Sequence, residues 1–350
     1  MKHLLLPAVI LAALATACGD TKPETVNAAD SRIEWSGRTI LTPDSAVRFN
    51  YPGVTARVRF DGPGLTMATS PGSGYFMVEV DSAAPRKVFF GPSDSVMVIA
   101  DSLGAGPHDA LVTYAVEGYE LKPVVRSFTA DAFGQAERPK GPKIEFIGNS
   151  ITCGYGTEAD SGDIRFSYDT ENHTLSYAWL TARALDADAN VVARSGIGVY
   201  RNFNGPLEGD TVQTMPLEYD RAMLYEPEPL WDFARFRPDI VCINLGTNDT
   251  STRNYDIARY ETACAAFVDH VRRMNPDAKI VLLTGSMMSG QELADVTGAL
   301  DRVASSREGV YRFDMTPQDG SLGFGADYHP SARQAEKMAS ELTAYLRGII

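Results

Sequence analysis

The stretch Ile144-Glu-Phe-Ile-Gly-Asn-Ser-Ile-Thr-Cys-Gly-Tyr-Gly156 decides the fold, because an apolar run ends directly in a glycine and a serine. Lys143 to Ile147 is typical of a buried strand, and Gly148 permits a tight turn after it. Ser150 would then lie at the corner between a strand and a helix, where a nucleophilic hydroxyl is exposed. A helix N-cap serine is the competing interpretation. The motif is not the Gly-x-Ser-x-Gly elbow, since Thr152 occupies its last position.

Strands and helices alternate along the chain from residue 143 to residue 350. The alternation favours a parallel sheet with helices on both faces, and in such a sheet functional groups collect beyond the carboxyl ends of the strands. After the first strand at 143–147, further strands are predicted at 190–193, 239–245, 279–284 and 310–313, and helices at 175–185, 255–274, 291–306 and 331–346.

Residues 32–135 are predicted to form an all-β domain of the jelly-roll or sandwich type. Apolar and polar residues alternate from Val54 to Phe60, and short apolar runs recur between Gly-Pro-rich turns. Short strands at this spacing are typical of a sandwich. The polar residues 136–142 are interpreted as a linker to the α/β domain at 143–350.

The N-terminus is interpreted as a targeting segment. Lys2 is followed by an uncharged, mostly apolar run from Leu4 to Ala17, which is too short to span a bilayer comfortably. The run resembles a bacterial lipoprotein signal in which residues 1–17 are removed and Cys18 is lipidated. We therefore expect an exported, membrane-anchored lipoprotein, facing the periplasm or the cell surface, with residues 18–31 as a tether. A plain secretory signal is the alternative.

Composition and charge indicate a folded protein and argue against a nucleic-acid partner. The chain has 350 residues, of which 44% are hydrophobic, enough for a folded core. Its net charge of −13 makes a nucleic-acid partner a poor expectation, because there are no excess cations to neutralise phosphates. Beyond Cys18, the odd number of remaining cysteines (Cys153, Cys242 and Cys264) cannot all pair, and no zinc-type spacing is present.

Three later segments contain candidate functional residues, two at predicted strand ends and one before the last helix. Gly196, in Arg194-Ser-Gly-Ile-Gly198, can bring a backbone N–H close to a ligand. Asn248, in the sequence Gly-Thr-Asn-Asp, offers an amide donor of the kind that stabilises an oxyanion. His329 could act as the general base for a serine. If this segment is extended, Asp327 faces the same side as His329 and could orient its ring.

Taken in order, these motifs resemble the SGNH (GDSL-type) hydrolase superfamily. The segments 144–156, 195–202, 230–233 and 327–330 are more similar still to carbohydrate esterase family 2. That family joins an N-terminal β jelly roll to a C-terminal SGNH domain. The resemblance therefore extends over nearly all of the chain after the targeting segment and matches the division found from composition.

The resemblance implies a role for each matching residue. Ser150 would be the nucleophile and His329 its base, while the Ser150 N–H, the Gly196 N–H and the Asn248 side chain would form the oxyanion hole. Asp327 would orient His329, although a backbone carbonyl performs this task in some family members. No metal ion or organic cofactor is implied.

The sequence departs from the family pattern at two positions. Asn149 stands where an aspartate commonly precedes the serine, so a charge is missing beside the nucleophile. Ala326 stands where the wider superfamily has its acid, three residues before the histidine. His173 is the rival candidate for the base, although its place near a predicted helix start favours capping or substrate contact.

The resemblance implies a serine esterase that removes acetyl groups from a carbohydrate such as xylan or glucomannan. Aromatic faces suit sugar rings, and the candidate substrate-binding residues are Tyr155, Tyr200, Arg201, Trp231 and Tyr328. Two alternatives stay open. One is a carbohydrate-binding surface lipoprotein with weakened catalysis, and the other is an SGNH lipase, thioesterase or acetyltransferase.

Overall fold

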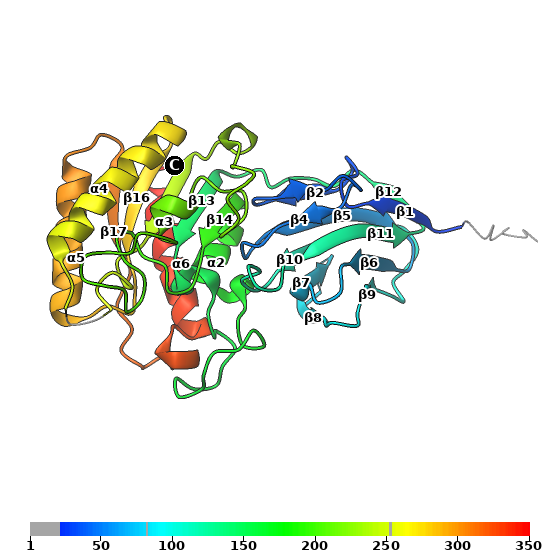
Figure 1. The fold of residues 1–350 in the computed structure, drawn as a ribbon. Coiled ribbons are helices and arrows are strands. Elements are labelled where there is room, and N and C mark those ends of the chain that lie inside the picture. The colour runs from blue at the N-terminus through cyan, green and yellow to red at the C-terminus, as the bar shows by residue number, and fades with distance from the viewer. Residues whose placement is uncertain (1–21, 82, 252–253) are drawn as a thin grey trace, which may run out of the picture.

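The computed structural model describes residues 22–350 except 82, 252 and 253. The predicted signal segment and Cys18 lie outside the described residues. Two domains follow one another along the chain, an N-terminal domain of strands and a C-terminal domain of strands and helices (Figure 1). Within the described residues, no helix is both long enough and apolar enough to cross a bilayer.

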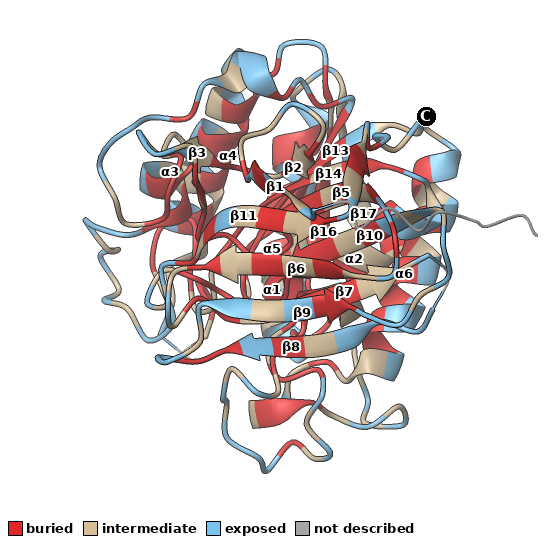
Figure 2. Ribbon diagram, turned by 90° about the vertical axis from the view of Figure 1, so that its right-hand side faces the viewer, coloured by how far each residue is buried: buried red, intermediate tan, exposed pale blue. Residues whose placement is uncertain are grey.

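The N-terminal domain is a sandwich of two antiparallel sheets, with orders β3-β4-β11-β6-β9 (β1 pairs β11) and β12-β5-β10-β7-β8 (β2 pairs β5). Figure 2, which looks onto this domain, shows buried and less buried residues alternating along β6 and β11. The strands are β1 (Glu24–Asn27), β2 (Glu34–Ser36), β3 (Ile40–Leu41), β4 (Val47–Arg48), β5 (Thr55–Asp61), β6 (Leu65–Thr69), β7 (Gly74–Val80), β8 (Arg86–Phe90), β9 (Val96–Ala100), β10 (Pro107–Tyr114), β11 (Val124–Ala130) and β12 (Ala132–Gly134).

The expectation of a tether over residues 18–31 is wrong for its described part. Glu24–Asn27 forms β1 and pairs antiparallel with β11. The side chain of Val26 is buried in the core of the sandwich, while Arg32 forms ion pairs with Glu24 and Asp30. An edge strand needs only an occasional apolar residue for one buried face, so this polar stretch gave little sign of strand structure.

The C-terminal domain is a parallel sheet with helices on both faces, as predicted (Figure 1). Helices α4 and α5 cover one face of the sheet, and α2 and α6 cover the other. The elements are β13 (Lys143–Gly148), α1 (Ser150–Cys153), α2 (Tyr177–Ala184), β14 (Asp188–Ala193), α3 (Met215–Glu218), β15 (Ile240–Asn244), α4 (Ile257–Met274), β16 (Lys279–Thr284), α5 (Gly290–Ser305), β17 (Val310–Asp314), α6 (Ala332–Arg347) and the 3₁₀ turns η1 (His173–Leu175), η2 (Phe233–Arg235) and η3 (Ala326–Tyr328).

The order of the sheet, β14-β13-β15-β16-β17, decides where a site can form. The chain runs from β13 to β14 on one side of it and later adds β15 on the other side. This reversal of strand order makes a topological switch point, which is where open parallel sheets bind ligands. The register pairs Gly148 with both Ala193 and Asn244. The loops that carry Ser150, Gly196 and Asn248 therefore leave the sheet from adjacent strand ends.

A buried cation fastens the two domains together. Arg38, between β2 and β3, is fully buried and forms an ion pair with Glu145 of β13. Its guanidinium also donates to the carbonyl oxygens of Tyr219 and Arg221 in the C-terminal domain. Because a buried guanidinium is costly unless its charge and donors are matched, these contacts fix how the domains meet.

We predict that Arg38→Met lowers the free energy of unfolding by about 3–5 kcal/mol, because it leaves the buried Glu145 carboxylate without its cation. Urea denaturation followed by tryptophan fluorescence measures the change. Arg126→Met, which removes an exposed ion pair with Asp44, is the control and should cost nothing measurable. A loss of less than about 1 kcal/mol in Arg38→Met would contradict the account.

Candidate active site

The serine at the first strand end has a hydroxyl that is free for chemistry. Ser150 is the first residue of α1, and the N-cap is instead Asn149, whose side-chain oxygen accepts the Ile151 N–H at 3.1 Å. A Cβ at Gly148 would lie 2.0 Å from Oγ1 of Thr152, so only glycine permits this turn. Asn149 thus acts as a neutral cap where the family commonly has an acid.

The histidine reaches the serine because two loops run side by side. The Ala326 N–H donates to the Gly156 carbonyl at 3.0 Å, and the Asp327 N–H donates to the Ile164 carbonyl at 2.8 Å. A Cβ at Gly156 would come within 2.3 Å of the Ala326 side chain, which leaves no room for a larger residue. This close approach places the segment before α6 against the loop after α1.

Ser150 and His329 form a catalytic pair by geometry. Oγ of Ser150 lies 2.8 Å from Nε2 of His329, and Nδ1 lies 3.1 Å from the Ala326 carbonyl oxygen. Because a carbonyl can only accept, Nδ1 carries the ring proton and Nε2 is left to accept the serine proton. Burial lowers the pKa of His329 to about 4, although nearby backbone carbonyls and the Asp327 charge oppose that shift.

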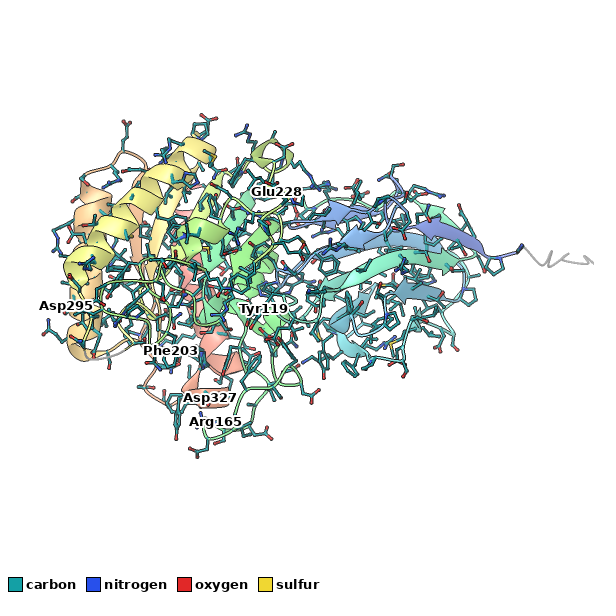
Figure 3. The ribbon with its side chains drawn as sticks, viewed as in Figure 1. Tyr119, Arg165, Phe203, Glu228, Asp295 and Asp327 are labelled. Atoms are coloured by element: carbon teal, nitrogen blue, oxygen red, sulfur yellow. The ribbon has the colours of Figure 1, made fainter. Side chains whose placement is uncertain are left out.

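The prediction that the Asp327 carboxylate orients His329 is wrong. Asp327 lies in η3 with φ 47° and ψ 38°, not in an extended segment, so its side chain turns away from the ring. The carboxylate instead accepts the Tyr155 hydroxyl at 2.8 Å and the Phe166 N–H at 3.0 Å, and forms an ion pair with Arg165. Figure 3 shows Asp327 and Arg165 next to each other.

Asp327 nevertheless restrains the histidine through an aromatic ring. The ring of Tyr155, whose hydroxyl Asp327 holds, stacks on the His329 imidazole with centroids 3.9 Å apart. Tyr155 also stacks on the ring of Phe166, with centroids 4.2 Å apart. The backbone carbonyl of Ala326 thus sets the tautomer, while Tyr155 limits the tilt of the imidazole.

The three residues predicted to form the oxyanion hole, Ser150, Gly196 and Asn248, all line the cleft. Gly196 adopts φ +80°, and no described residue accepts its N–H or that of Ser150. One N–H of the Asn248 amide donates to the Ile197 carbonyl at 2.8 Å, which leaves the second N–H for a ligand. These donors can stabilise a negative oxygen formed beside Ser150.

A buried acid that was not predicted from the sequence, Asp249, holds the loop that follows β14 and carries Gly196. The Asp249 carboxylate accepts the backbone N–H groups of Val199, Tyr200 and Arg201 at 2.8–3.3 Å. Burial raises its pKa to about 6, and these donors oppose that rise. Asp249 thereby fixes the loop after Gly196 to the loop that carries Asn248. The sequence signal that could have pointed to Asp249 is its place as the last residue of the Gly-Thr-Asn-Asp motif.

The pair opens onto a cleft of about 1030 Å³. Of the predicted substrate-binding residues, Tyr155 and Tyr328 line it, and Tyr328 is 52% exposed. Most of the other lining residues could not be predicted from sequence patterns, because they come from loops scattered along the chain. They include Asp163, Arg165, Arg194, Asn202, Phe203, Thr250, Ser251, Met287, Met288, Ser289 and Glu292.

Three predicted substrate contacts and the rival base lie outside the cleft. Trp231 is buried under the guanidinium groups of Arg38 and Arg235. Tyr200 and Arg201 are buried in the loop that Asp249 holds, and the Arg201 Nε donates to the Asp249 carbonyl at 2.7 Å. These contacts show that the three residues serve packing and backbone support.

His173 does not face Ser150. It is fully buried in η1, with Nδ1 3.3 Å from the Cys153 carbonyl oxygen, and burial lowers its pKa to about 4. It therefore supports the fold beneath α1. All three described cysteines, Cys153, Cys242 and Cys264, are buried and unpaired.

A serine-histidine pair at a switch point, with N–H donors on the adjacent loops, defines a serine hydrolase of the SGNH type. Comparison with known proteins agrees. Residues 146–337 match the GDSL-like Lipase/Acylhydrolase family, and residues 35–139 match the Carbohydrate esterase 2 N-terminal domain.

Similar proteins share both domains. The chain is 33% identical over 325 residues to cellulase/esterase CelE of Acetivibrio thermocellus, covering 90% of this chain but only 39% of that longer protein. It is 28% identical to an acetylxylan esterase / glucomannan deacetylase of Cellvibrio japonicus, covering 99% of each. A family two carbohydrate esterase from Clostridium thermocellum, solved in complex with cellohexaose, superposes with a TM-score of 0.83 at 32% identity, covering 91% of this chain and 98% of that one. The chain belongs to carbohydrate esterase family 2.

The lowered pKa of His329 predicts an unusual acid limit for activity. Only the neutral ring accepts the Ser150 proton, so kcat/KM should fall as pH drops through about 4. A profile of kcat/KM against pH with para-nitrophenyl acetate measures this. Half-loss near pH 6.5, about the ordinary value for histidine, would contradict the burial that we describe.

Proposed function

We propose that this protein is a serine esterase that removes O-acetyl groups from polysaccharides such as xylan or glucomannan. The observation that carries the proposal is the 2.8 Å contact between Oγ of Ser150 and Nε2 of His329 at the wall of an open cleft. Relatives named as acetylxylan esterase / glucomannan deacetylase support this substrate class.

The first half of the proposed reaction acylates the serine. His329 takes the Ser150 proton as the oxygen attacks the acetyl carbonyl carbon, and the carbonyl oxygen becomes negative. The N–H groups of Ser150 and Gly196 and the free N–H of Asn248 stabilise that charge. His329 then returns the proton to the sugar oxygen, which leaves as an alcohol.

The second half releases acetate. His329 removes a proton from water, the water attacks the acetyl-serine through the same oxyanion hole, and Ser150 regains its proton from the imidazolium. The Ala326 carbonyl and the Tyr155 ring keep His329 oriented through both halves.

The alternatives have less support. A binding protein with weakened catalysis was suggested by Asn149, but the amide serves as the α1 cap and the Ser150–His329 contact has normal hydrogen-bond length. The cleft lining mixes polar side chains such as Asp163 with apolar ones such as Phe203 and Met288, so the preference for an acetyl group over a long acyl chain rests on the relatives named as acetylxylan esterase / glucomannan deacetylase. Acetyl transfer between glycans would use the same acetyl-serine and differs only in the acceptor.

We predict that the protein releases acetate from acetylated xylan and acetylated glucomannan, and that Ser150→Ala lowers the rate by roughly 10³-fold or more, because the nucleophile is lost. Ser305→Ala, at the exposed end of α5, is the control and should match the wild type. Equal acetate release by the wild type and Ser150→Ala would contradict the proposal.

We further propose that the protein is exported and anchored through a lipid on Cys18, because the apolar run ends directly before that residue. In a bacterial host, the wild type should take up radiolabelled palmitate and fractionate with membranes. Cys18→Ala should take up no label and leave the membrane fraction. Equal labelling of both proteins would overturn the anchor.

A further inference from the structure

A buried carboxylate of the β domain contacts the loop that carries Gly196. Glu117 follows β10 and is 3% exposed. Its Oε1 accepts the Ser195 N–H at 2.6 Å, and its Oε2 accepts the Ser195 hydroxyl in a short hydrogen bond. The reaction described above does not use this carboxylate, so its burial calls for another explanation.

The backbone is held by a carboxylate both before and after Gly196. Glu117 fixes the residue before the glycine, and Asp249 fixes the backbone of Val199 and the two residues after it. The Gly196 N–H lies in the peptide plane that joins Ser195 to Gly196, so its direction depends on how Ser195 and the backbone after Gly196 are held. The two carboxylates together therefore determine where the Gly196 N–H points, and a misplacement of about 1 Å can cost up to about 10²-fold in rate.

A second buried carboxyl group lies against the first. Oε2 of Glu171 accepts the Glu117 N–H at 3.1 Å, while Oε1 has no hydrogen-bond partner among the described residues. Two neighbouring buried carboxylates cannot both be ionised at neutral pH. Burial and the charge of Glu117 raise the pKa of Glu171 well above its usual range. Of the two, Glu117 is the group whose oxygens both accept hydrogen bonds from Ser195, so it is the one placed to hold a negative charge.

A cation beside the pair stabilises the charge on Glu117. Burial raises the pKa of Glu117, but the Ser195 donors and the positive charge of Arg194 oppose that rise. The Arg194 guanidinium lies over the rings of Tyr119 and Tyr225, with 5.6 and 5.7 Å to the centroids. Tyr119, labelled in Figure 3, belongs to the same β-domain segment as Glu117.

The pair does not have the donor set of a metal centre. Glu117, Glu171 and Cys153 could offer ligand atoms within 4.8 Å of one another. A divalent metal would require a deprotonated thiol, whereas burial raises the pKa of Cys153 well above its usual value. Glu117 also already accepts two hydrogen bonds from Ser195. The residues fit a carboxyl-carboxylate pair.

We propose that Glu117 is a positioning residue for the oxyanion hole: from the β domain, its carboxylate holds Ser195 so that the adjacent Gly196 N–H stays directed at Ser150. Glu171 supports the backbone of Glu117 by accepting its N–H. The β domain thereby contributes to catalysis without touching substrate. This inference rests on the proposed esterase function, because it assigns Glu117 to the stabilisation of the same tetrahedral oxyanion.

The test is the kinetics of Glu117→Gln with para-nitrophenyl acetate, which needs the oxyanion hole but no sugar. The amide keeps the size of the side chain and accepts one hydrogen bond, but it loses the charge and the second acceptor. We expect kcat to fall about tenfold or more, with KM within about twofold of the wild type. Because the probe lacks a carbohydrate, a wild type active on it but inactive on acetylated polysaccharides would refute the proposed substrate class while leaving this test valid.

Glu79→Gln is the matched control. It makes the same substitution in the β domain and breaks another contact between the domains, the 2.9 Å ion pair with Arg183 of α2. Its kcat should match the wild type. If Glu79→Gln and Glu117→Gln lose kcat equally, or if Glu117→Gln raises KM alone, the positioning role is overturned. A stoichiometric divalent metal that the wild type retains and Glu117→Gln releases would overturn it as well.

Ser195→Ala keeps the proposal testable if Glu117→Gln folds poorly, and where both variants fold, the double variant completes a double-mutant cycle. Ser195→Ala removes the hydroxyl donor and should lower kcat by a smaller factor, about threefold or more. The two changes act on one contact, so the double variant should be no slower than Glu117→Gln. Losses that multiply, or a normal kcat in Ser195→Ala, would count against the proposal.

Discussion

The register of the parallel strands is the constraint on which the site depends. Gly148 pairs with Ala193 on one side and Asn244 on the other, so three successive loops must leave the sheet at one edge. Each loop then needs only a short path to deliver its group: Ser150, Gly196 or Asn248. A shift of one residue in either pairing would turn the strand faces over and separate the nucleophile from its oxyanion donors.

Buried carboxylates hold the loops in place beyond the strand ends. Asp249 joins the second loop to the third, and Glu117 joins the second loop to the β domain. Arg38 and Glu145 fasten the domains at another point, so the β domain has a fixed position from which Glu117 can act. The cost of burying the three carboxylates is offset by the donors that each one receives, and the cost of burying Arg38 by the carboxylate and carbonyl groups that accept from it. With the proposed role of Glu117, the two domains act as one catalytic unit.

Much of this arrangement could be predicted from the sequence. Apolar periodicity gave the alternating strands and helices, and the glycine, serine, asparagine and histidine motifs gave the residues that meet in the cleft. Local backbone conformation could not be predicted in the same way. Asp327 was expected in an extended segment, and its left-handed φ turned the carboxylate toward Tyr155. The prediction that Trp231 contacts substrate was wrong for another reason. In a sequence, an aromatic residue that binds sugar looks the same as one that packs against a buried arginine, as Trp231 does.

The central claim is that Ser150, activated by His329, carries the acetyl group between sugar and water. The most direct test is to quench the reaction on acetylated xylan with acid within the first turnovers and analyse the peptides by mass spectrometry. The account predicts one added acetyl group on the peptide that contains Ser150, and none in His329→Ala. Rapid acetate release by the wild type, with no acetylated Ser150 under conditions that trap a serine acyl-enzyme in a reference esterase, would contradict it.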